Sequence, residues 1–125
     1  MFDSLKGMAG MAGLMRDLPK IKARMEKAKG ELAHIIVEAE TGGGAVRASV
    51  NGQLRLVGLH VDQPLIAGLV DGTNPDDRAM AEDLIIGAVN AALEKARERA
   101  EHELASAAQE LNLPIPAGGL GGLLG

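Results

Sequence analysis

The chain has 125 residues, 46% of them hydrophobic and 24% charged, which is the composition of one globular domain. It has one aromatic residue and no cysteine, so disulfides and thiolate metal sites are excluded and the core volume is small. The apolar run 7–15 is too short to span a bilayer, and no secretory signal pattern precedes it. We therefore expect a soluble intracellular protein whose small core favours oligomerisation.

Charge is distributed unevenly along the chain. The formal net charge is −4, yet residues 1–30 carry a net +4 and residues 31–125 a net −8. Closely spaced lysines and arginines neutralise phosphates in nucleic-acid binding proteins, but they also form ordinary solvated helix faces. Charge alone leaves both readings open.

An apolar stripe at alternating spacings of four and three residues predicts a first helix over 18–33. The stripe comprises Leu14, Leu18, Ile21, Met25, Ala28 and Leu32. We expect Asp17 to cap this helix and Pro19 to occupy its first turn, where the missing N–H costs little. Upstream, the Gly/Met-rich residues 7–13 suit either a loose helix or a mobile arm.

The hydrophobic period changes to two after Ile35, which predicts strands over 35–40 and 45–50 around a loop at 41–44. This loop pairs Ala39 with Val46, Val37 with Ala48, and Ile35 with Val50. The Asn51–Gly52 pair predicts a second hairpin, which places Leu54 and Leu56 on the same face. A phase slip indicates a bulge near Gly58, and the third strand should end by Asp62.

Residues 63–72 contain Pro64, Gly68 and Gly72, and we expect an irregular connector there. Asn74 and Pro75 then start one long helix that runs to Leu111. At 1.5 Å per residue that helix spans about 50 Å, so its far half must project or meet a partner. The predicted fold is α+β in the order α-β-β-β-α, with one domain at 1–113 and a flexible Gly/Leu-rich tail at 114–125.

No constellation of residues indicates catalysis. His34, His60 and His102 are isolated, and the adjacent Glu82 and Asp83 diverge by 100° on a helix. The triple glycine at 42–44 lacks the lysine of a phosphate loop, and no nucleophile motif is present. We expect no enzyme activity, cofactor or metal. The methionines at 8, 11, 15 and 25 suit helix packing better than an adaptable binding surface.

Several segments together resemble the YbaB/EbfC family of bacterial nucleoid-associated proteins. They are the Met- and Lys-rich first helix, residues 42–46 (GGGAV), 49–52 (SVNG), 59–66 (LHVDQPLI) and 82–92 (EDLIIGAVNAA). The resemblance implies a tweezers-shaped homodimer with helices projecting from joined sheets. It further implies a cytoplasmic, nucleoid-located protein that binds DNA and influences nucleoid organisation or gene expression.

Basic residues beside the apolar stripe are the candidate DNA contacts. The chain has one Phe and no Trp or Tyr to stack on bases, which favours contact with the duplex backbone over single-strand or RNA base recognition. They are Lys20, Lys22, Arg24, Lys27 and Lys29, with Arg47 and Arg55 as weaker candidates. The expected partners are duplex DNA and a second copy of the chain, with no membrane and no small-molecule substrate. The alternative is a non-enzymatic protein-interaction scaffold with weak or no DNA binding, which the acidic long helix favours.

Overall fold

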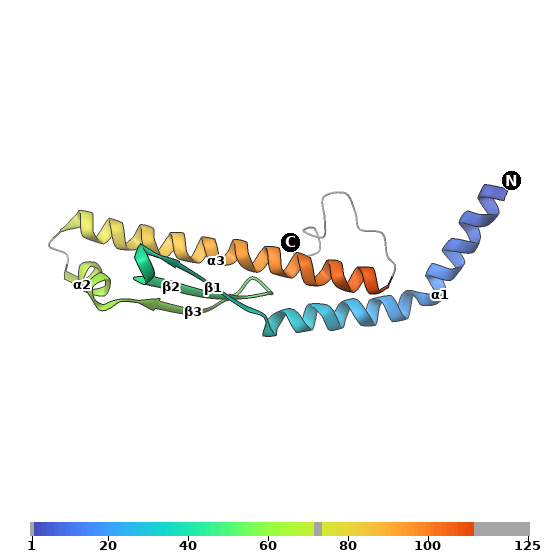
Figure 1. The fold of residues 1–125 in the computed structure, drawn as a ribbon, viewed down its shortest axis with the longest axis horizontal. Coiled ribbons are helices and arrows are strands. Elements are labelled where there is room, and N and C mark those ends of the chain that lie inside the picture. The colour runs from blue at the N-terminus through green and yellow to red at the C-terminus, as the bar shows by residue number, and fades with distance from the viewer. Residues whose placement is uncertain (1, 72–73, 112–125) are drawn as a thin grey trace.

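The protein is an elongated α+β molecule, described by a computed structural model for residues 2–71 and 74–111 (Figure 1). Its order confirms the predicted helix, three antiparallel strands and long helix. The elements are α1 (Phe2–Glu31), a 3-10 turn (Leu32–His34), β1 (Ile36–Thr41), a second 3-10 turn (Gly42–Gly44), β2 (Val46–Asn51), β3 (Leu56–Val61), α2 (Gln63–Asp71) and α3 (Pro75–Glu110). The predicted tail at 114–125 lies outside the described residues.

The three strands form one antiparallel sheet in the order β1-β2-β3. The predicted faces are correct, but the predicted register between β1 and β2 is wrong by two residues, since Val37 pairs with Val50 and Ala39 with Ala48. The turn still holds four residues but lies one residue later, at 42–45, because three glycines with φ of 62°, 68° and 97° let Thr41 remain in the strand, paired with Val46. The predicted bulge is confirmed beside Gly58, where Val57 is the extra residue.

Helix α3 covers one face of the sheet, mainly over β1 and β2 (Figure 1). Asn74 caps its start as predicted, with its side-chain oxygen accepting from the backbone N–H of Asp76 at 3.0 Å. Alanines at 88, 92 and 96 lie against buried side chains of the sheet, and the small methyl groups let helix and sheet approach closely. This sheet cluster consists of Ala39, Val46, Ala48, Val50, Ala88, Ala92 and Ala96.

A second apolar cluster joins α1 to the far half of α3. This tip cluster consists of Ala28, Leu32, Ala100, Leu104 and Ala107. The N-terminal boundary predicted for the first helix is wrong, because α1 begins at Phe2 and contains Pro19 in its interior. Figure 1 shows α1 bending part-way along its length and projecting past the end of α3, and an interior proline is an ordinary cause of such a bend.

The predicted irregular connector after β3 is also wrong, because residues 63–71 form helix α2. Pro64 stands in the first turn, where no N–H is needed, and the carbonyl of Asp62 accepts from the backbone N–H groups of Leu65 and Ile66. Gly68 does not break the helix but faces Asp77 of α3. Packing against α3 therefore overrides the propensity of this short segment.

The β2–β3 turn anchors the C-terminal end of α1. The N–H of Gly52 lies 2.9 Å from the carbonyl oxygen of Leu32 and 3.0 Å from that of Ile35. Asn51, which is buried, accepts from the N–H groups of Gln53 and Arg55 and holds the turn in shape. The direction of α1 is therefore tied to the sheet through this turn.

Replacing Gly52 with Ala should destabilise the fold by about 1–3 kcal/mol, because the new β-carbon would lie 2.6 Å from the carbonyl oxygen of Leu32. The matched control is Gly30→Ala in α1, where a β-carbon meets nothing within 4 Å. That control should be neutral or stabilise by up to about 1 kcal/mol. Urea unfolding measures both changes. An unchanged unfolding midpoint for Gly52→Ala would contradict the role of Gly52 in holding the end of α1.

Candidate nucleic-acid interface

The basic side chains of α1 lie on two flanks of the stripe that packs against α3. Lys20 and Lys27, seven residues apart, share one flank, while Lys22 and Lys29 share the other. All four side chains are exposed, and among the described side chains of residues 15–70 and 74–111 none takes part in an ion pair with them. The second half of α1 therefore presents cations on both sides of a firmly seated helix.

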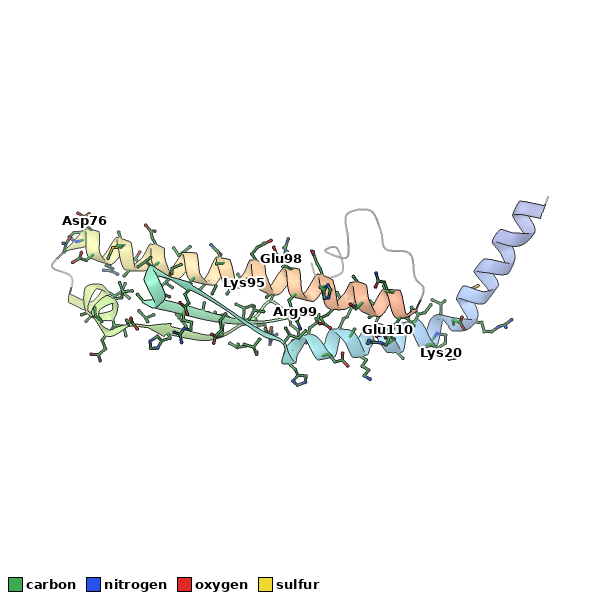
Figure 2. The ribbon with its side chains drawn as sticks, in the orientation of Figure 1. Lys20, Asp76, Lys95, Glu98, Arg99 and Glu110 are labelled. Carbon is green, nitrogen blue, oxygen red and sulfur yellow. The ribbon has the colours of Figure 1, made fainter. Side chains whose placement is uncertain are left out.

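Arg24 differs from its basic neighbours because it faces α3. Its Nε donates to the Oε2 of Glu110 at 2.8 Å, and its side chain is only 27% exposed. The hydrogen bond with Glu110 holds the pKa of Arg24 above its ordinary value, and it holds the pKa of the Glu110 carboxyl below its ordinary value. In the free protein Arg24 thus ties α1 to the last turn of α3, where Figure 2 labels Glu110.

The two weaker candidates occupy the sheet and are not brought together. Arg47 in β2 donates to Glu40 of β1 at 3.2 Å, so its charge is partly compensated. Arg55, exposed, stands just before β3 next to the turn that touches α1, where the Gln53 side chain donates to the carbonyl of Lys29. The structure thus brings Arg55, but not Arg47, near the end of α1.

Acidic residues gather on the side of α3 that faces away from the sheet. Glu94, Glu98 and Glu101 follow one another at helical spacing opposite the buried Ala92 and Ala96. Figure 2 shows Glu98 pointing away from the sheet. The net acidity of the chain is therefore concentrated on an outer face that differs from the basic flanks of α1.

A surface that the sequence analysis missed lies along β3. Leu56 and Leu59 pair with the buried Val50 and Ala48 and so belong to the core face, yet they are 48% and 47% exposed. The reason is that α3 barely reaches β3. The alternation of residues marked this face correctly, but the sequence carried no signal for how far the helix would cover it.

The same surface continues onto one side of α3. Thr41 of β1 contacts Leu84 and Gly87, so the opposite side of the helix, which carries Val89 and Leu93, is directed toward β3. Both of these residues are only partly buried, and Ile86 beside them is 57% exposed. We call Leu56, Leu59 and Ile86 the β3 face, an open side of the sheet cluster.

The described residues offer little for other chemistry. None of their helices is both long and apolar enough to cross a membrane. Residues 2–71 and 74–111 contain no group of three or more His, Asp or Glu that is arranged to hold a metal ion. The notable surfaces of the described chain are therefore its charged helix faces and its apolar edge.

Comparison with known proteins assigns the chain to a family. Residues 8–111 match the YbaB/EbfC DNA-binding family. The chain belongs to this family. A nucleoid-associated protein from Anaeromyxobacter dehalogenans is 44% identical over 105 residues, which cover 84% of this chain and 95% of the relative. A nucleoid-associated protein from Moorella thermoacetica is 33% identical over 108 residues, which cover 86% and 97% respectively.

A solved structure supports the fold of this YbaB/EbfC family member. The crystal structure of an uncharacterized protein from Helicobacter pylori matches with a TM-score of 0.51 and 23% identity. The match covers 66% of this chain and 87% of that chain. At this identity the similarity concerns the fold alone.

The Arg24–Glu110 pair should make stability depend on pH in the acid range. Because the pKa of Glu110 is below its ordinary value of 4.5 in the folded chain, the pair stabilises the fold at neutral pH. This contribution should be lost as the pH falls through the folded pKa. We expect the difference in unfolding free energy between wild type and Glu110→Gln, measured by urea titration, to vanish toward pH 2. If wild type and Glu110→Gln still differ in unfolding free energy at that pH, the ion pair is not the source of the difference.

Proposed function

We propose that this protein is a non-enzymatic, nucleoid-located homodimer that binds duplex DNA through phosphate contacts from α1. The observation that carries the proposal is the set of four exposed lysines on α1 with no ion-pair partner among the described side chains of residues 15–70 and 74–111. Membership of a DNA-binding family supports DNA as the polyanion. The names of the relatives support a place in the nucleoid.

The distribution of charge favours one mode of approach. Lys20, Lys22, Lys27 and Lys29 attract phosphates, while Glu94 and Glu98 on the outer face of α3 repel them. DNA therefore approaches α1 and not the back of α3. Lysine contacts to phosphate carry little sequence information, so specificity comes from DNA shape or is weak. Arg55 is an additional contact in this proposal, because it follows the turn whose Gln53 side chain donates to the carbonyl of Lys29 in α1.

The proposed dimer interface is the β3 face. Its three exposed apolar side chains adjoin the partly buried Val89 and Leu93, so a partner that covers them completes the sheet cluster. β3 is also an edge strand with an unpaired backbone, which a second copy of the chain can protect. A dimer formed through the β3 face carries twice as many α1 lysines as a single chain.

Replacing the lysines of either flank should weaken DNA binding and flatten its salt dependence. We expect Lys20→Ala/Lys27→Ala, and separately Lys22→Ala/Lys29→Ala, to make the slope of log affinity against log salt shallower. If one flank supplies about two of some five phosphate contacts in the dimer, its removal should make the slope shallower by about 2. Fluorescence anisotropy with a labelled random duplex measures this slope.

The control removes two exposed cations of α3 with Arg78→Ala/Arg97→Ala, both far in sequence from α1, although Arg78 is paired with Glu82 at 3.1 Å. The control should leave the slope within about 0.5 of wild type. If both lysine pairs leave the slope unchanged, α1 is not the DNA-binding element.

A charge placed in the β3 face should separate the subunits. Leu59→Asp buries a carboxylate in the proposed interface, so light scattering should report the 12.9 kDa chain in place of a particle of about twice that mass. Ile36→Asp is the control, since Ile36 is 53% exposed on the opposite face of the sheet. That variant should stay dimeric. A dimeric Leu59→Asp protein with an intact fold would move the interface elsewhere.

A further inference from the structure

Glu110 of α3 holds Arg24, an arginine of the proposed DNA-binding helix α1. It is the last residue of α3, its side chain is 60% exposed, and it accepts from Arg24 at 2.8 Å. Arg24 lies in α1 between Lys20 and Lys27, four residues after one and three residues before the other. The carboxylate therefore stands at one lysine flank, where a DNA phosphate would otherwise find a third cation.

The contact is incomplete in a way that makes exchange possible. A carboxylate commonly binds arginine through two parallel hydrogen bonds, whereas Glu110 uses only the Nε of Arg24. The Nη1 of Arg24 is buried and has no partner among the described residues. A DNA phosphodiester has two non-bridging oxygens, which can accept from arginine in the paired geometry that Glu110 does not use.

Other charged side chains lie near this ion pair. The carboxylates of Glu31 in α1 and Glu103 in α3 help to raise the pKa of Arg24, and the charge of Lys27 helps to lower the pKa of Glu110. Glu103 is itself bound to Arg99 at 3.4 Å, so it is not equally available to Arg24. Glu110 is thus the carboxylate that holds Arg24 directly.

We propose that Glu110 is a built-in competitor of DNA, which holds Arg24 in the free protein and is displaced by a phosphate in the complex. This inference rests on the proposed DNA-binding function of α1. It assigns opposite effects to one carboxylate, since Glu110 stabilises the contact between α1 and α3 and lowers the affinity for DNA. If Glu110 had only a structural role, its removal would not lower the stability of the fold and at the same time raise the affinity for DNA.

The test compares Glu110→Gln with Glu98→Gln, which removes the same charge from the outer face of α3 (Figure 2). We expect Glu110→Gln to bind a labelled random duplex about 3- to 10-fold more tightly at 0.1 M salt and to unfold at lower urea concentration. Glu98→Gln should change the affinity less than about 2-fold. Equal affinities for the two variants, or weaker binding by Glu110→Gln, would overturn the proposal.

A second pair of variants shows whether Glu110 acts through Arg24. In an Arg24→Gln background, the Glu110→Gln substitution should change the affinity less than about 2-fold, because the competed cation is absent. If Glu110→Gln tightens DNA binding equally well in that background, the effect comes from general repulsion between the Glu110 charge and DNA. That result would overturn the proposed exchange of Glu110 for a phosphate at Arg24. The proposed function fails separately, if wild type does not bind DNA or if the lysine variants bind like wild type.

Discussion

The alanine face of α3 is the constraint on which the rest of the structure depends. Alanines at 88, 92 and 96 bring the helix onto the sheet, and alanines at 100 and 107 bring α1 onto its far half. A helix of 36 residues spans about 54 Å, whereas strands of six residues span about 20 Å. One helix therefore serves two clusters, and the second cluster lies beyond the sheet.

This arrangement explains where the charges lie. Because the buried face of α3 packs along its length, Glu94 and Glu98 point outward, whereas Glu110 at the end of the helix reaches Arg24 of α1. Helix α1 packs on α3 through the alanines and leucines of the tip cluster, and its lysines remain exposed on both flanks. The same packing brings Arg24, an expected DNA contact, to Glu110 of α3. A net-acidic chain can in this way present a basic arm.

The sequence predicted the features that depend on local pattern. Alternation gave the correct faces of β1 and β2, and Asn74 gave the start of α3. Features that depend on contacts between distant elements were missed or wrong. The two-residue register error arose in the triple-glycine turn, and α2 is helical because it packs against α3. The pairing of Arg24 with Glu110, 86 residues away, has no local signal at all.

The central claim is that the exposed lysines of α1 make the dimer a phosphate-binding particle. It is tested most directly by titrating wild-type protein into labelled random duplex DNA at several salt concentrations, with light scattering on the same samples. Binding by a dimer whose log affinity falls with log salt at a slope of about −4 to −5, as expected for about five phosphate contacts, is the predicted result. An intact dimer that fails to bind at about 50 mM salt would contradict the claim and favour a protein-interaction scaffold.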